Sequence, residues 1–405
     1  MRPMSARVKA VQVPIIPQVA DWIRANPGTL SLGQGIAGYG PPPEAWTALE
    51  RLKQDPVLHR YQPVGGLPEL VDAMKQRVAR RLGVPVGADR RLMVTAGANA
   101  AFQQVVLAIC DPGDEVLLPL PWYFNQEMAL TLANVRPVPV PGDSRHWPLL
   151  DSLKGALTPR TRAVVTVSPN NPTGAVYPPA LLRSINEFCR DHGLFHISDE
   201  TYEAFVHGDT PHASPGALPG SEPHTICLHS LSKAFGFASW RIGFVILPAA
   251  LEAPFRAIQD TWLICPPVVS QLAGLGCLQA PDSWLQSRLA GIQTVRRQVL
   301  DGLQALDAEV RSSPADGAFY VFLELPAGMD SLAVTRLLIE EHRVAVIPGT
   351  AFGMTDPPSL RVAYGALSPE TAGEGIGRLV RGLHQLRSDP RCRTAGFRPL
   401  QAHPA

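Results

Sequence analysis

The sequence predicts an α/β fold with a mostly parallel sheet, followed by a smaller α+β region. Short apolar runs alternate with amphipathic segments between about residues 65 and 282. This alternation is typical of βαβ units, which build parallel sheets. After residue 282 a long helical pattern is followed by short strands and two further helices. The length of 405 residues suits two domains.

In the first region, residues 65–83 show the clearest helical spacing, and Gly83 stands where a helix usually ends. Helices are also predicted at Val19–Arg24 and Leu181–Arg190. A further helix is predicted to carry four apolar residues on one face, namely Phe102, Val105, Val106 and Ile109. Strands are predicted at Leu92–Thr95, Glu115–Leu120, Val135–Val140, Arg162–Val167, Leu194–Ile197, Ile226–Leu228 and Arg241–Leu247.

The second region has helical patterns at Trp284–Leu306, Ser331–Glu341 and Thr371–Leu386. Its strands are predicted at Ala318–Leu325, Val344–Ile347 and Leu360–Tyr364. We therefore expect a large domain over residues 45–282 and a small domain from residues 1–44 and 283–388. Residues 389–405 show no periodicity and are predicted to form a mobile tail.

Composition narrows the class of protein. The formal net charge of +1 gives no electrostatic reason to expect nucleic acid or an anionic membrane as partner. No apolar run resembles a signal peptide or could span a bilayer. The six cysteines are scattered and form no C-x-x-C pair, which indicates reduced thiols, a cytoplasmic location and no metal site. Only 18% of residues are charged, which favours some surface buried between subunits.

One motif looks like a dinucleotide site. Residues 33–38 match G-x-G-x-x-G, which binds dinucleotides only where a helix opens at it. Here three consecutive prolines follow at residues 41–43, and they cannot form the first turns of such a helix. A loop where the backbone closely approaches a ligand or another chain is the better interpretation.

Lys233 lies in Ser230-Leu231-Ser232-Lys233, between apolar segments. The S-x-x-K spacing also occurs in serine acyl-enzymes, but the S-D-N and K-T-G motifs of those enzymes do not follow. Apolar surroundings lower the pKa of an ammonium, and proteins place such lysines mainly where they act as nucleophiles. We expect Lys233 to be a reactive amine and not a solvated surface lysine.

Two nearby features predict a phosphate site. Arg241 follows Lys233 by eight residues, and Ser230 and Ser232 add hydroxyl donors. Upstream, the small residues of Gly97-Ala98-Asn99 stand between a strand and a helix, where backbone N–H groups can face an anion. Together they indicate a phosphorylated cofactor at the carboxyl edge of the sheet.

Two further strands end in polar residues. Asp199 follows a strand and could pair with a cationic ring nitrogen, although a helix N-cap is an equally good local interpretation. Asn171-Pro172-Thr173-Gly174 follows another strand and could be simply a tight turn.

As a set, these motifs resemble the class I/II aminotransferases of PLP (pyridoxal 5′-phosphate) fold type I. The resemblance extends from about Ser31 to about residue 386. It implies a large domain with a mostly parallel, seven-stranded type of sheet and a smaller α+β domain. It also implies PLP as cofactor and an amino acid and a 2-oxo acid as substrates.

The resemblance also implies roles for single residues. Lys233 would hold PLP as a Schiff base and carry the proton, Asp199 would keep the ring nitrogen protonated, and Tyr202 and Asn171 would contact the phenolic oxygen. Tyr123 would stack on the ring, and the phosphate would be bound by Gly97, Ala98, Asn99, Ser230, Ser232 and Arg241. In a homodimer, Tyr61 would reach the partner's phosphate. Arg361, with Gly35 and Asn171, would bind the substrate carboxylate.

The substrate side chain is less clearly indicated. Members that act on aspartate carry a second cation, at positions where this chain has Asp260 and Asn99. The neighbouring Trp262, Leu263, Ile264, Tyr39 and Trp122 favour an aromatic, apolar or sulfur-containing side chain. Asp260 raises the alternative of a cationic or guanidino amino acid.

Other reaction classes stay open at this point. A relative with the same cofactor residues could catalyse elimination, Cα–Cβ cleavage or cyclisation of an amino acid. A binding protein that kept the fold without catalysis is disfavoured, because Lys233, Asp199, Arg241 and Arg361 are all present.

Overall fold

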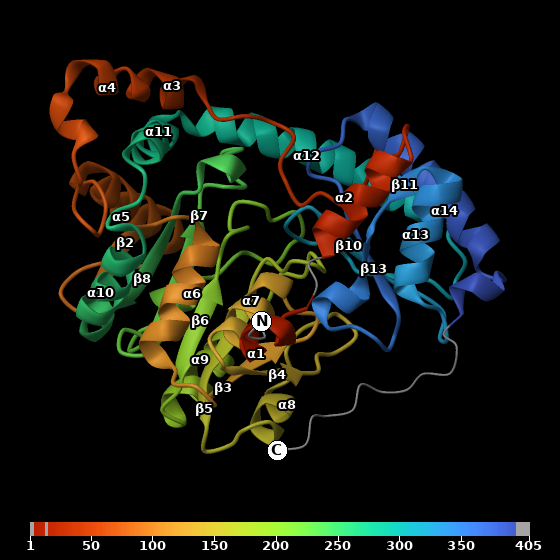
Figure 1. Ribbon diagram of the computed structural model, residues 1–405, viewed down its shortest axis with the longest axis horizontal. Helices are drawn as coiled ribbons and strands as arrows, with labels where there is room; N and C mark the ends of the chain where they lie inside the picture. The colour runs from red at the N-terminus through yellow and green to blue at the C-terminus, as the bar shows by residue number, and fades with distance from the viewer. Residues whose placement is uncertain (1–3, 13–14, 394–405) are drawn as a thin grey trace.

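The computed structural model describes residues 4–12 and 15–393 (Figure 1). Its centre is a seven-stranded sheet of order β2-β8-β7-β6-β5-β3-β4. The strands are β2 (Arg90–Thr95), β3 (Glu115–Pro119), β4 (Arg136–Val140), β5 (Thr161–Val167), β6 (Phe195–Asp199), β7 (Thr225–Ser230) and β8 (Gly243–Pro248). Neighbours from β7 to β4 pair in parallel, as the strand–helix alternation predicts.

Strand β8 departs from this pattern, because it pairs antiparallel with both β2 and β7. The segment between β7 and β8 contains only a 3-10 turn at Ala238–Trp240 and no crossover helix. A chain that returns without a crossover helix runs antiparallel. Arg241 therefore precedes the strand, and the prediction that the strand begins there is wrong by two residues.

Helices cover the sheet and connect its strands. Those of the large region are α3 (Pro43–Leu49), α4 (Arg51–Gln54), α5 (Pro68–Leu82), α6 (Ala98–Ile109), α7 (Phe124–Leu132), α8 (Leu150–Gly155), α9 (Pro179–Asp191), α10 (Glu252–Leu263) and α11 (Val268–Gln279). Sequence reasoning missed α3, α4, α7, α8, α10 and α11. Helix α11 is buried over most of its length, so it lacks the polar face that reveals a surface helix. Helix α5 ends at Gly83 in the left-handed conformation, as predicted.

The C-terminal region forms a second layer at the other end of the molecule (Figure 1). A four-stranded antiparallel sheet has the order β12-β13-β10-β9. The strands of this sheet are β9 (Arg311–Ser312), β10 (Tyr320–Glu324), β12 (Ile347–Pro348) and β13 (Ser359–Ala363). The helices of the C-terminal region are α12 (Asp282–Leu303), α13 (Ser331–His342) and α14 (Pro369–Leu386). The predicted strand Val344–Ile347 is two strands, because β11 (Val344–Ala345) pairs instead with β1 (Leu30–Ser31).

The N-terminal segment packs against this second layer. Helix α2 (Ile15–Ala25) contacts α13, whereas the short α1 (Ala6–Ala10) lies against α7. The division of the chain at residues 45 and 282 stays a prediction; residue 282 is the first residue of α12.

The predicted tail needs correction at its start. Residues Pro390–Cys392 form a 3-10 turn, Cys392 is buried, and its carbonyl oxygen accepts a hydrogen bond from the Asp330 N–H. The rest of the predicted tail, residues 394–405, lies outside the described residues.

Candidate functional site

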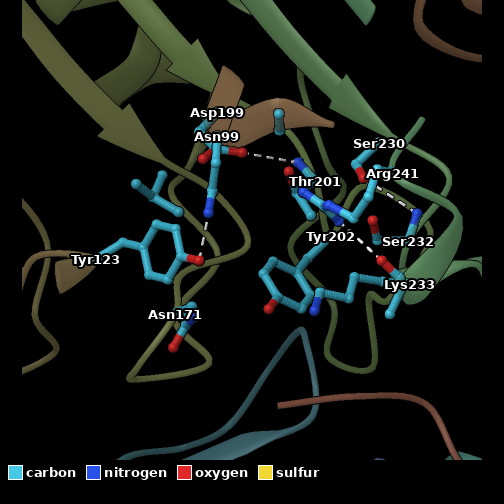
Figure 2. Close-up of a pocket in the computed structure, with 13 residues that line it drawn as sticks. Asn99, Tyr123, Asn171, Asp199, Thr201, Tyr202, Ser230, Ser232, Lys233 and Arg241 are labelled. Carbon is cyan, nitrogen blue, oxygen red and sulfur yellow. Dashed lines mark hydrogen bonds between the residues drawn. The ribbon is translucent and has the colours of Figure 1, made fainter. Parts of the chain in front are cut away.

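One edge of the seven-stranded sheet collects the polar residues that the sequence singled out. Strands β2, β5, β6 and β7 end there, and β8 begins there because it runs the other way. A cavity opens at this edge. Thirteen residues line it: Ala98, Asn99, Tyr123, Val167, Asn171, Asp199, Thr201, Tyr202, Ser230, Ser232, Lys233, Ala238 and Arg241 (Figure 2).

Lys233 follows β7 and points into this cavity (Figure 2). Its Nζ donates a hydrogen bond to the carbonyl oxygen of Gly35, at 2.7 Å. Burial, reinforced by the positive charges of Arg361 and Arg241, lowers the pKa of the lysine to about 8, while Asp199 acts in the opposite direction. The amine is therefore largely neutral in mildly alkaline solution, as a nucleophile must be.

The lowered pKa predicts how the protein without cofactor reacts with an aldehyde. Below about pH 8 the buried amine is protonated, so the rate of reaction with pyridoxal should rise about tenfold per pH unit and then level off above pH 8. Stopped-flow absorbance across this pH range measures it, and Lys233→Ala should form no borohydride-stable adduct. A rate that keeps rising to about pH 10, as for an ordinary lysine, would contradict the assignment.

Asp199 is the last residue of β6 and is 6% exposed. Its Oδ2 accepts a hydrogen bond from Gln126 Nε2 at 2.9 Å, and its Oδ1 accepts one from the Thr201 N–H at 3.1 Å. Burial raises the pKa of the carboxyl group, and hydrogen bonds from Thr201 only partly offset this effect. A cation placed in the cavity beside Asp199 would stabilise its charged form. The alternative interpretation of Asp199 as a helix N-cap is correct in part, because its carboxylate accepts a hydrogen bond from the Thr201 N–H, but no helix follows.

The far end of the cavity is lined by groups suited to an anion. Helix α6 begins at Ala98, so its N-terminal N–H groups face this end. Gly97 has a φ of 87°, and a Cβ there would collide with the Arg241 guanidinium. Ser230, Ser232 and Arg241 lie on the opposite side (Figure 2). Gly97 thus allows a cation to approach the helix N-terminus closely.

Three side chains flank the middle of the cavity. Tyr123 lies on the side of Asn171, across from Lys233 (Figure 2), and its hydroxyl accepts a hydrogen bond from Asn125 Nδ2 at 2.8 Å. Tyr202 is buried, with its hydroxyl 2.6 Å from that of Tyr320. Burial raises the pKa of Tyr202 well above its ordinary value, so the phenol stays a proton donor at neutral pH.

Arg361 enters from β13 of the second sheet and is 2% exposed. Its Nη1 donates to Asn171 Oδ1 at 2.9 Å and its Nη2 to the Gly33 carbonyl oxygen at 2.7 Å. Its Nε has no partner among the described residues. The structure therefore brings Arg361, Asn171 and the Gly33–Gly38 loop together. The carbonyl oxygens of this loop accept hydrogen bonds from Arg361, at Gly33, and from Lys233, at Gly35.

Several residues proposed from the sequence lie elsewhere. Tyr61 is 80% exposed, and Asp260 and Trp262 are exposed on α10, outside the cavity lining. The Tyr39 hydroxyl donates to the carbonyl oxygens of Lys233 and Ala234, so it braces the lysine loop. Trp122 packs against Gly353 and lines a separate small cavity. Five apolar residues favoured an aromatic, apolar or sulfur-containing substrate, and none of them is among the described residues that line the cavity: Trp262, Leu263, Ile264, Tyr39 and Trp122.

Other site residues were missed. Gln126, Thr201 and Ala238 contact or line the site, and Tyr320 contacts Tyr202. Gln126 stands one helical turn after Tyr123, a spacing that would have placed both near the same edge had α7 been predicted. No sequence pattern next to Tyr320 indicates that it belongs to the site, because it reaches the site from another sheet.

Comparison with known proteins identifies the family. Residues 27–379 match the model of aminotransferase class I and II. The chain belongs to this family. An aromatic aminotransferase of Arabidopsis thaliana is 32% identical over 95% of this chain and 97% of its own length. An arginine–pyruvate transaminase of Pseudomonas aeruginosa is 34% identical over 79% of this chain and 81% of its own.

A solved structure supports the same conclusion. Aspartate aminotransferase from Thermus thermophilus, with maleate, superposes with a TM-score of 0.86 at 29% identity, covering 94% of this chain and 100% of that one. Aminotransferases of this fold use PLP, so this aminotransferase is a PLP-dependent enzyme that transfers an amino group from an amino acid to a 2-oxo acid. The lyase, cyclase and binding-protein alternatives are thereby set aside. The cavity fits PLP: it combines an amine, a buried carboxylate, an aromatic ring and an anion site.

No described helix combines the length and the apolar composition needed to cross a membrane.

Proposed function

We propose that this aminotransferase acts on L-amino acids with aromatic, other apolar or sulfur-containing side chains. The observation that carries the proposal is the distribution of positive charge. Of the described residues that line the cavity, only Lys233 and Arg241 are cationic, and Arg361 lies beside Asn171. We assign these three to the cofactor linkage, the phosphate and the substrate α-carboxylate. No lining cation then remains for a second carboxylate.

The cofactor would be held at five points. Lys233 would bind the aldehyde carbon, Asp199 the ring nitrogen, Tyr123 the ring face, and Tyr202 with Asn171 the phenolic oxygen. The phosphate would contact Gly97, Ala98, Asn99, Ser230, Ser232 and Arg241. When bound, PLP supplies an electron sink that makes the substrate Cα–H acidic. Lys233, neutral above about pH 8, is the base placed to accept that proton.

The substrate would be oriented by Arg361. Its planar guanidinium matches a carboxylate, and Asn171 and Gly33 hold that plane in place. Gly35, whose carbonyl oxygen contacts Lys233, belongs to the loop that would close over the bound substrate and exclude water.

A substrate screen tests this proposal. Protein loaded with PLP is mixed with L-phenylalanine, L-tyrosine, L-methionine, L-aspartate or L-arginine, and the loss of the cofactor's visible band is followed in single turnovers. We expect the aromatic amino acids to react at least about tenfold faster than aspartate, because a buried, unpaired carboxylate is costly. Faster reaction with aspartate would reject the proposed class of aromatic, apolar or sulfur-containing substrates. A separate variant, Asp260→Arg, tests whether Asp260 contributes to any turnover of L-arginine.

Gly97 provides a sharp prediction for the phosphate site. Gly97→Ala should displace Arg241 and weaken PLP binding by about 10- to 100-fold, the effect of losing one charge-assisted hydrogen bond. Equilibrium titration with PLP measures the change. Gly291→Ala is the matched control, because a Cβ there, within α12, meets nothing within 4 Å. Equal affinity for the two variants would remove Arg241 from the phosphate site.

We also propose a cytoplasmic homodimer in which Tyr61 reaches the partner's phosphate. Tyr61 is 80% exposed, and Trp46 and Val57, which precede it in the chain, are also large exposed apolar side chains, as subunit contacts often require. Sedimentation equilibrium tests the dimer. Tyr61→Phe should lower PLP affinity if the hydroxyl contacts the phosphate.

A further inference from the structure

Tyr320 lies at a point where three parts of the site meet. It is carried by β10 of the small sheet and is fully buried. Its hydroxyl is 2.6 Å from the hydroxyl of Tyr202, which follows β6 of the large sheet. This contact joins the two sheets inside the site.

Two further contacts fix the position of Tyr320. The centre of its ring lies 4.7 Å from the Arg361 guanidinium carbon, a cation–π contact. Its hydroxyl also lies against Gly35, where an added Cβ would be only 2.5 Å away. The ring is thus held between the proposed carboxylate clamp and the loop that contacts Lys233.

The direction of the hydroxyl–hydroxyl bond follows from counting protons. Each phenol carries one proton, and burial raises the pKa of Tyr320 to about 12, so both phenols stay protonated at neutral pH. If Tyr202 donates its proton to the phenolic oxygen of PLP, it can only accept from Tyr320. The result is a chain in which Tyr320 donates to Tyr202 and Tyr202 donates to the cofactor.

We propose that Tyr320 is a positioning residue that orients and strengthens the hydrogen bond from Tyr202 to the cofactor. This inference rests on the role proposed above for Tyr202. Donation into a hydroxyl makes that hydroxyl a better donor. A stronger bond to the phenolic oxygen favours the cofactor form in which this oxygen is negatively charged, and so lowers the pH at which the cofactor's visible band changes.

The test is a pH titration of that visible band in PLP-loaded wild type, Tyr320→Phe, Tyr202→Phe and the double variant. Tyr320→Phe keeps the ring that packs against Arg361 and removes only the hydroxyl. We expect it to raise the midpoint by about half a unit to one unit. In the Tyr202→Phe background, Tyr320→Phe should cause no further shift, because its effect passes through Tyr202. Tyr364→Phe, which removes another buried tyrosine hydroxyl near the end of the adjacent strand β13, should leave the midpoint unchanged.

Each other outcome has a definite meaning. If Tyr202→Phe shifts the midpoint and Tyr320→Phe does not, Tyr320 has no positioning role and the assignment of Tyr202 stands. An equal shift from Tyr320→Phe in both backgrounds would show that it does not act through Tyr202, which overturns the proposal. If Tyr202→Phe itself causes no shift, the role of Tyr202 fails and the inference about Tyr320 fails with it.

Discussion

Lys233→Ala is expected to lower the single-turnover rate with L-phenylalanine by about 10⁴-fold or more. Removing a positioned general base alone typically costs 10²- to 10⁴-fold, and the variant also loses the amine that forms the covalent link to the cofactor. The geometry offers no substitute: of the described residues that line the cavity, Lys233 is the only one with an amine.

The measurement is the loss of the cofactor's visible band after mixing with substrate. Lys75→Ala is the control, since this lysine lies on α5 and pairs with Asp72 at 3.1 Å outside the site. It should react at the wild-type rate. If Lys233→Ala still converted the cofactor at a rate within tenfold of wild type, another base would have to be found.

Arg361→Leu is expected to lower kcat/KM for L-phenylalanine by about 10²- to 10⁴-fold. Two charge-assisted hydrogen bonds to the substrate carboxylate, at about 1.5–3 kcal/mol each, account for that range. Arg361→Lys should recover only part of the loss, because an ammonium keeps the charge but cannot present two parallel donors.

A substrate analogue separates binding from structural damage. Phenethylamine lacks the carboxylate, so its much slower reaction should be nearly the same in wild type and Arg361→Leu. Arg387→Leu is the control arginine, as its ion pairs with Asp307 and Glu309 lie on the surface. An equal loss for both substrates would mean that Arg361 supports the fold, through Asn171 and Gly33, more than it binds substrate.

Residues close in sequence were predicted best. Ser230, Ser232, Lys233 and Arg241 lie within twelve residues of one another, and Gly97, Ala98 and Asn99 form one turn. Their grouping at a strand end follows from local pattern and from the rule that sites in open α/β sheets lie at the carboxyl edge. The structure places all of them around one cavity except Gly97, which lies beside Arg241.

The substrate side was predicted less well. Trp262, Tyr39 and Trp122 favoured an aromatic, apolar or sulfur-containing substrate, but their side chains lie at the surface, on the lysine loop and in a separate cavity. Sequence position near a motif does not specify which way a side chain points. Trp262 lies on α10 and Trp122 lies just before α7, two of the helices that sequence reasoning missed.

By itself the sequence determined the family and the α/β class, because these depend on short motifs and on strand–helix alternation, and it predicted the residues that would hold PLP. Only the tertiary structure showed that β8 reverses direction, that Gln126 holds Asp199, and that Tyr320 joins Tyr202 to Arg361. The physical reason is distance along the chain. Tyr320 and Tyr202 are 118 residues apart, and contacts of that range arise only when two sheets pack together.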